Sequence, residues 1–192
     1  MAHRKTIQHV HEPGHLHEFT FSCYRRKQLL TNDSLLEILS RTLDAAGAAE
    51  GFQLLAFVFM PEHIHLLTLP TTAEPNFGRY LGLIKQPFSK QIKEVLLSQR
   101  SSLIEQLTVR ERPGKTCFRF WQEGPGYDRN LTSRAAILAS PDYIPKNPVQ
   151  RGLCVKAIDW KWSSARYHLL EPPCQQFPEL PRLHPFPSGV FD

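Results

Sequence analysis

The feature that most constrains the fold is an apolar stretch interrupted once by a turn. Residues 52–60 are rich in aromatic and β-branched side chains, Pro61 and Glu62 follow, and residues 63–69 resume the pattern. Since such side chains favour strands and Pro favours turns, this stretch predicts two strands joined by a tight turn. Its longest uninterrupted apolar run has seven residues, Leu54 to Met60, far below the roughly 20 that cross a bilayer. A membrane-spanning protein is therefore excluded.

Strand and helix patterns alternate around this hairpin. Residues 16–24 alternate apolar and polar side chains, which is typical of a half-buried strand. Residues 32–47 predict a helix that Asn32 or Asp33 caps and Gly47 ends. A second helical pattern begins near Phe77, and we expect Pro87 to kink or divide it.

The second half of the chain is richer in proline. Residues 98–116 show no sustained period and indicate a connecting excursion, and residues 117–121 alternate again as a strand. A helix is predicted within residues 131–153, and its prolines are expected to make the second half irregular. Ser163 is a candidate cap for a last helical turn.

The order β-α-β-β-α-β predicts an α+β fold: a ferredoxin-like antiparallel sheet with helices on one face and an additional C-terminal helix. We expect one domain over residues 1–170. Residues 171–192 form a proline-rich tail, which we expect to be extended on the surface or mobile.

Composition narrows the class of protein. The 192 residues carry 23 Lys and Arg against 18 Asp and Glu, a net charge of +5 that suits a polyanionic partner but does not require one. The first twenty residues are polar and basic, which removes the usual secretory signal and predicts a cytoplasmic protein. The four cysteines form no C-x-x-C pair and are expected to be reduced thiols.

His63 and His65 are the strongest candidates for chemistry. Residues two apart in a strand share a face, so both imidazoles can reach one divalent ion, which could then polarise a phosphoryl oxygen. The pattern His-x-His also occurs at His9 and at His15, but there it lies in a polar lead-in that predicts solvated side chains. The alternative for the hairpin pair is two hydrogen-bonded edge histidines without a metal.

Covalent chemistry at such a metal needs a nucleophile nearby. Tyr143 differs from the other tyrosines because Asn147 follows four residues later, on the same face of a helix. A phenol and a carboxamide in that arrangement could address one metal-bound phosphate. The alternative is that Tyr143 packs against the core and Asn147 only caps a helix before Pro148.

Together these segments resemble the REP-associated tyrosine transposases, relatives of the single-strand HUH transposases. The matching pieces occur in family order across residues 17–168. The two most specific are M-P-x-H-I-H-L-L at residues 60–67 and Y-I-x-x-N-P-V-x-R-G-L at residues 143–153.

The resemblance implies a metal-dependent nuclease and strand transferase that cuts single-stranded DNA near a hairpin through a 5′-phosphotyrosine. It assigns His63, His65 and Asn147 as ligands of Mg²⁺ or Mn²⁺, and Tyr143 as the nucleophile. The expected partner is single-stranded or hairpin DNA, bound by a monomer or a homodimer. Two departures stand out: Pro141 and Pro145 flank Tyr143, and Glu62 replaces an asparagine that is frequent in the family.

Basic side chains near these motifs are candidates for DNA contacts, although each on its own is also an ordinary solvated charge. They are Arg25, Arg26, Lys85, Lys90, Arg129 and Arg151.

Two other functions stay open. The prolines around Tyr143 raise the alternative of a catalytically inactive, decayed or domesticated hairpin-DNA-binding protein. A metal-dependent hydrolase of another phosphoester would use the histidines without the tyrosine and would form no covalent intermediate.

Overall fold

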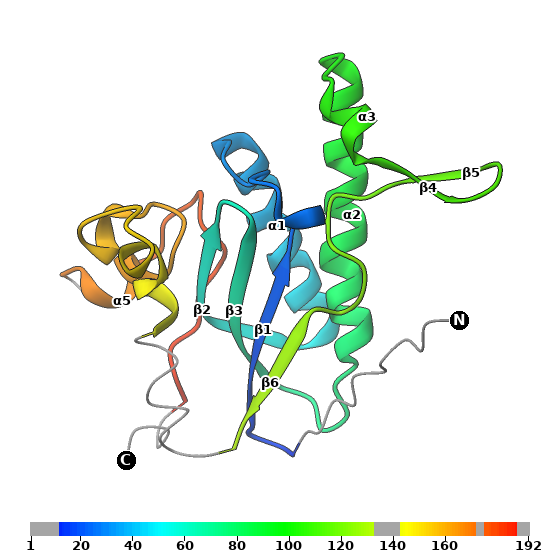
Figure 1. The fold of residues 1–192 in the computed structure, drawn as a ribbon. Coiled ribbons are helices and arrows are strands. Elements are labelled where there is room, and N and C mark those ends of the chain that lie inside the picture. The colour runs from blue at the N-terminus through cyan, green and yellow to red at the C-terminus, as the bar shows by residue number, and fades with distance from the viewer. Residues whose placement is uncertain (1–11, 133–142, 172–174, 188–192) are drawn as a thin grey trace.

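The computed structural model describes residues 12–132, 143–171 and 175–187. Its main sheet has four antiparallel strands in the order β2-β3-β1-β6, and two long helices, α1 and α2, connect them (Figure 1). The predicted α+β class and antiparallel sheet are confirmed. The elements are β1 (Leu16–Ser22), η1 (Tyr24–Arg26), α1 (Asp33–Glu50), β2 (Phe52–Met60), β3 (His63–Pro70), α2 (Phe77–Ser98), α3 (Leu103–Leu107), β4 (Thr108–Arg112), β5 (Lys115–Phe118), β6 (Tyr127–Leu131), η2 (Ala157–Asp159) and α5 (Ala165–Leu169).

The predicted hairpin is present, with β2 and β3 joined at Pro61 and Glu62. The register places Met60 opposite His63. Two backbone bonds from outside the hairpin hold the turn: the Cys23 amide donates to the Glu62 carbonyl (2.8 Å) and the Leu30 amide to the Pro61 carbonyl (2.9 Å). The turn is therefore tied to the segment of the chain that follows β1.

The two long helices form as the sequence pattern predicts, with one correction to the end of α1. The Asn32 side chain caps α1 by accepting from the Leu35 amide (3.3 Å), as expected. The helix does not end at Gly47 but runs to Gly51, whose φ of 68° supplies the left-handed conformation that ends a helix. Pro87 does not divide α2, which is assigned as one helix of 22 residues.

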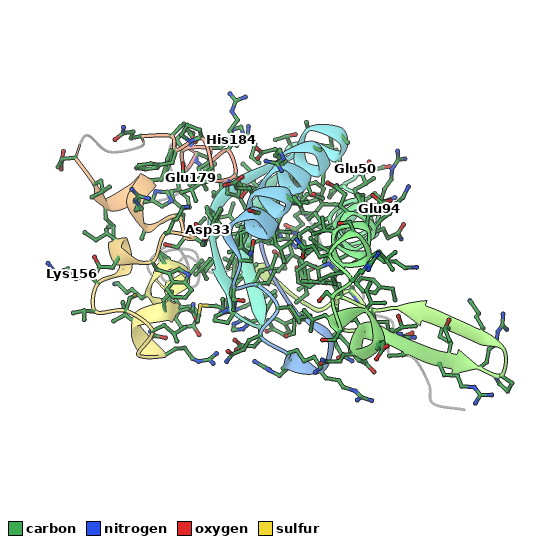
Figure 2. The ribbon with its side chains drawn as sticks, turned by 90° about the horizontal axis from the view of Figure 1, so that it is seen from above. Asp33, Glu50, Glu94, Lys156, Glu179 and His184 are labelled. Carbon is green, nitrogen blue, oxygen red and sulfur yellow. The ribbon has the colours of Figure 1, made fainter. Side chains whose placement is uncertain are left out.

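The predicted last strand is wrong in position. Residues 115–118 form β5, which pairs with β4 in a separate two-stranded ribbon that projects from the body of the molecule (Figures 1 and 2). The fourth strand of the main sheet is β6, which pairs with β1. The side chains of Phe120 and Trp121 both pack on Phe88 of α2, with ring centroids 5.0 and 5.4 Å away.

The two faces of the sheet carry different clusters. The face beneath α1 and α2 is aromatic and aliphatic, with Phe19, Phe57 and Ile64 fully buried. The opposite face carries a smaller cluster that includes Val58 and Leu67. The helix that contains residues 143–150, called here the Tyr143 helix, covers this second cluster through the fully buried Ile144.

Part of the proline-rich tail packs against the body. Leu180 and Leu183 are 6% and 3% exposed and join the cluster beneath α1 and α2. The Arg182 amide donates to the Asp44 carboxylate on α1 (2.8 Å).

Among the described residues, no helix has both the length and the apolar character needed to span a membrane. Cys23, Cys117 and Cys154 are free thiols, and Cys174 lies outside the described residues.

Candidate active site

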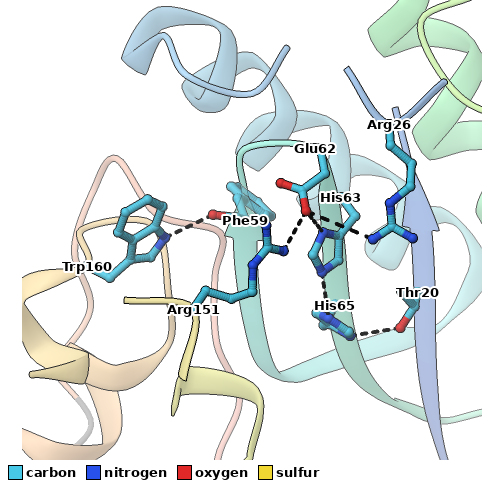
Figure 3. Close-up of polar contacts among 8 residues, drawn as sticks. All are labelled: Thr20, Arg26, Phe59, Glu62, His63, His65, Arg151 and Trp160. Carbon is cyan, nitrogen blue, oxygen red and sulfur yellow. Dashed lines mark hydrogen bonds and ion pairs between the residues drawn. The ribbon is translucent and has the colours of Figure 1, made fainter. Parts of the chain in front are cut away.

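The face of the sheet opposite α1 and α2 gathers the predicted catalytic residues. His63 and His65 both lie on it, as the strand period predicts, because Leu67 belongs to its cluster while Ile64 and Leu66 belong to the other. Both histidines are nearly buried, with exposed fractions of 7% and 9%. The Nε2 atoms of the two rings lie 3.0 Å apart (Figure 3).

Each imidazole ring also has a hydrogen-bond partner at its other nitrogen, Nδ1. The Nδ1 atom of His63 lies 3.1 Å from Oε1 of Glu62, and Nδ1 of His65 lies 2.8 Å from the Thr20 hydroxyl (Figure 3). Glu18 Oε1 is 3.8 Å from the same His65 nitrogen. Hydrogen bonds of this kind fix ring orientation and tautomer in metal sites, and they leave both Nε2 atoms facing one point.

Burial governs the charge of this cluster. It lowers the pKa of His65 to about 4, an effect that the charge of His63 reinforces. Burial also lowers the pKa of His63, against the opposing effect of Glu62. For Glu62, burial acts to raise the pKa, but the Arg151 hydrogen bond and the charge of His63 outweigh it and the pKa lies below its ordinary value. Two neutral imidazoles beside a carboxylate are a donor set that could bind a cation.

Tyr143 lies over this pair. Its ring meets the His65 ring edge-on, with centroids 6.5 Å apart and an interplanar angle of 83°. Tyr143 is 45% exposed, so the residue is accessible from solvent. The structure thus brings together three of the four residues that the sequence motifs single out, His63, His65 and Tyr143, although they come from segments about 80 positions apart.

The side chain of Asn147 also forms hydrogen bonds within the Tyr143 helix. Pro148 has no N–H to donate to the Ile144 carbonyl, and the Asn147 side-chain amide donates to that carbonyl instead, as well as to that of Tyr143 (both 3.1 Å). This explains why residues 143–150 are helical although irregularity was predicted there. Pro141 lies outside the described residues. The carboxamide oxygen of Asn147 is the atom that could bind a metal.

The described side chains supply only part of the ligand set that a hard divalent ion needs. Two cis ligands at about 2.1 Å in an octahedron lie roughly 3 Å apart, which is the separation of the two Nε2 atoms. Among the described residues, no group of three or more His, Cys, Asp or Glu side chains is placed to hold a metal. An ion here would take its remaining ligands from water, from substrate oxygens or, as the resemblance implies, from Asn147.

The other histidines lie elsewhere. His9 and His11 fall outside the described residues. His15 is not simply solvated as predicted, because its ring is about one quarter exposed and contacts Glu12 and Asn130. His17 is fully buried on the helix side of the sheet, 4.4 Å from the Phe77 ring and 3.1 Å from an Asp128 oxygen.

The basic candidates divide into two groups. Three arginines surround the site. Arg26 and Arg151 lie 3.9 and 2.6 Å from the Glu62 carboxylate. Arg129 lies 3.9 Å from the Glu18 carboxylate. Arg25 is exposed beside Tyr24 and Lys90 is exposed on α2.

Lys85 is not at the site. Its ammonium donates to the carbonyls of Gly124 and Pro125 (2.8 and 3.1 Å) and lies over the Phe21 ring. Burial lowers its pKa to about 8. This lysine fastens the loop that leads into β6.

Sequence reasoning missed two residues of this face. Thr20 lies opposite both His65 on β3 and Tyr127 on β6, so the three side chains form a row across the sheet. Tyr127 is 60% exposed and is the second accessible tyrosine on this face. The signal for Thr20 was its polar position in the alternation of β1, whereas Tyr127 could not be placed until β6 was known.

No family model matches the chain. A protein from Haemophilus influenzae, named "Putative REP-associated tyrosine transposase", is 25% identical over 115 residues, which cover 59% of this chain. The matched region spans 58% of the length of that relative. A solved structure described as a REP-associated tyrosine transposase bound to a REP hairpin shares the fold, with a TM-score of 0.64 and 18% identity, over 94% of this chain and 99% of that one. The resemblance that the motifs indicate is confirmed.

Proposed function

We propose that this relative of the REP-associated tyrosine transposases is a metal-dependent nuclease and strand transferase that acts on single-stranded DNA near a hairpin. One observation carries the proposal: an accessible tyrosine lies edge-on to one of two buried imidazoles whose Nε2 atoms are 3.0 Å apart. A metal-binding histidine pair with no nucleophile nearby would suit simple hydrolysis. A tyrosine beside that pair suits a covalent intermediate.

The chain's own residues would divide the work as follows. His63 and His65, with the Asn147 oxygen, would hold Mg²⁺ or Mn²⁺, which supplies Lewis-acid stabilisation of charge on the phosphoryl oxygens. The Tyr143 oxygen attacks the scissile phosphorus and releases the 3′ oxygen, so that a 5′-phosphotyrosine and a 3′-hydroxyl form. The phenol proton is lost and the leaving oxygen gains one, so the step is balanced.

The first test compares Tyr143 with Tyr127, the matched control on the same face. Labelled hairpin oligonucleotides with single-stranded flanks and Mn²⁺ should yield a covalent adduct on a denaturing gel. We expect the adduct to vanish in Tyr143→Phe, which keeps the ring contact with His65, and in His65→Ala. It should persist in Tyr127→Phe.

Other results would point elsewhere. Loss of the adduct in Tyr127→Phe but not in Tyr143→Phe would move the nucleophile to β6. Hairpin binding with no adduct from the unmodified protein would support the catalytically inactive DNA-binding protein instead. Cleavage without any adduct would support the hydrolase.

A further inference from the structure

Glu62 is the point where three parts of the site meet. Its Oε1 atom lies 3.1 Å from His63 Nδ1, 2.6 Å from Arg151 Nη1 and 3.9 Å from Arg26 Nη2 (Figure 3). The residue is 5% exposed. The second carboxylate oxygen, Oε2, is buried and has no hydrogen-bond partner within the described chain. A buried carboxylate held through one oxygen depends strongly on the partners of that oxygen.

Arg151 connects this carboxylate to the Tyr143 helix. The helix ends in a Schellman motif: the Gly152 amide donates to the Val149 carbonyl and the Leu153 amide to the Pro148 carbonyl (both 2.9 Å). Gly152 has the φ of 67° that this motif requires. The backbone at Arg151 is therefore fixed relative to the helix, so its guanidinium transmits the position of the helix to Glu62.

The backbone of Glu62 is also fixed relative to the sheet. Its carbonyl accepts from the Cys23 amide, and it directly precedes His63 on β3. One carboxylate thus ties a predicted metal ligand to the end of the helix that carries the predicted nucleophile, across 89 positions of sequence.

We propose that Glu62 and Arg151 are positioning residues: Glu62 turns the His63 Nε2 atom toward His65 and, through Arg151, docks the Tyr143 helix so that the phenol lies over the same imidazoles. The inference rests on the proposed phosphotyrosine chemistry. It gives Arg151 a role other than the phosphate contact that its charge suggests. It also gives a purpose to the glutamate that departs from the family's usual residue before the first histidine.

The test compares Glu62→Gln, Arg151→Met and the double variant with an exposed ion pair as matched control. Glu37 and Arg41 on α1 are 4.0 Å apart and solvated, so Glu37→Gln and Arg41→Met make the same chemical changes away from the site. Three quantities are measured: the hairpin Kd by fluorescence anisotropy without metal, the single-turnover adduct rate at saturating hairpin, and the Mn²⁺ affinity by calorimetry.

We expect each site variant to lower the adduct rate at saturating DNA by about 10–100-fold, which is typical when the outer partner of a metal ligand is lost. The hairpin Kd should stay within about twofold, and Glu62→Gln should also weaken Mn²⁺ binding. The double variant should be no slower than the slower single variant, because both changes break one link. Arg151→Lys, which keeps the charge and a donor, should restore much of the rate. The control variants should match the unmodified protein.

Three results would overturn the inference. A weaker hairpin Kd and a smaller salt slope in Arg151→Met, with the saturated rate unchanged, would make Arg151 a phosphate contact. Multiplying effects in the double variant would show two independent roles, and an unchanged rate in Glu62→Gln would remove Glu62.

The proposed function can fail separately. If the unmodified protein forms no adduct, amide hydrogen exchange of residues 143–150 and the Mn²⁺ affinity still decide. Faster exchange of that helix in Glu62→Gln and in Arg151→Met, with α5 unchanged and with Mn²⁺ bound more weakly by Glu62→Gln, would uphold the positioning link. Unchanged exchange would refute it.

Discussion

The Nε2 atoms of the two imidazoles lie 3.0 Å apart, so the two rings can share one hydrogen-bonded proton when no cation lies between them. The Thr20 hydroxyl can donate to His65 Nδ1, His65 Nε2–H to His63 Nε2, and His63 Nδ1–H to Oε1 of Glu62, so both nitrogens of each ring have a partner. A bound cation would replace the shared proton and reverse the Thr20 hydrogen bond. The hydroxyl suits this position because it both donates and accepts.

This arrangement predicts a pH dependence of stability for the metal-free protein. His65 has a pKa of about 4 when folded, against an ordinary value of 6.5, so the unfolded chain binds more protons between these values. The free energy of unfolding should therefore fall as pH drops from 6.5 toward 4, with a loss from this residue approaching about 3 kcal/mol at the acid end.

Urea unfolding of the metal-free protein at several pH values measures this loss. His63, His168 and His184 also have lowered pKa values through burial and add their own slopes, so the comparison is with His65→Gln, which retains all three. The variant should lose less stability between pH 7 and pH 4.5. Equal slopes in the two proteins would contradict the prediction.

At the scale of elements, the loop before β6 depends on one glycine. Gly126 has a φ of 93°, and a Cβ there would collide with the Thr20 carbonyl oxygen and come within 2.8 Å of the Phe21 side chain. Gly124 has a similar φ of 97°, but a Cβ there would meet open space. The two positions therefore separate backbone strain from steric collision.

Gly126→Ala should destabilise the protein more than Gly124→Ala, and it should also disturb the site because it pushes on Thr20. For Gly124→Ala we expect a loss of about 1–2 kcal/mol from the left-handed conformation alone. Thermal unfolding and Mn²⁺ affinity measure the two effects. Equal losses in both variants, with unchanged Mn²⁺ binding, would show that the loop adapts without cost.

The sequence predicted the elements whose side chains face a core, and missed β4 and β6, whose side chains mostly do not. The hairpin of β2 and β3 shows its period because both strands are almost wholly buried. β6 is an edge strand with charged and polar residues, of which only Leu131 is buried, so its pattern does not stand out from a loop. The motifs identify the histidine pair and the tyrosine, but the contact of Glu62 with Arg151 depends on three-dimensional packing.

At the scale of the whole molecule, the C-terminal tail contributes to the core. Deleting residues 175–192 should destabilise the protein, because Leu180 and Leu183 each contribute about 1.5–3 kcal/mol when fully buried. Leu183→Ser should reproduce part of that loss, whereas Arg182→Ser, at an exposed neighbour, should cost less. Urea midpoints measure all three. A deletion as stable as the full chain would mean that the tail only rests on the surface.

The outer edge of β2 is already used by later parts of the chain. The Phe59 amide donates to the Trp162 carbonyl, the Ser164 amide to the Phe57 carbonyl and the His184 amide to the Leu54 carbonyl (2.8–2.9 Å). A second copy could not add a strand there without first displacing these segments, so the edge is protected against aggregation. Within the described residues, the opposite end of the sheet is β6. In the main sheet as described, strand addition by a second copy would therefore occur at β6, and antiparallel pairing of the two β6 strands would place both tyrosine-bearing faces on one side of a continuous sheet.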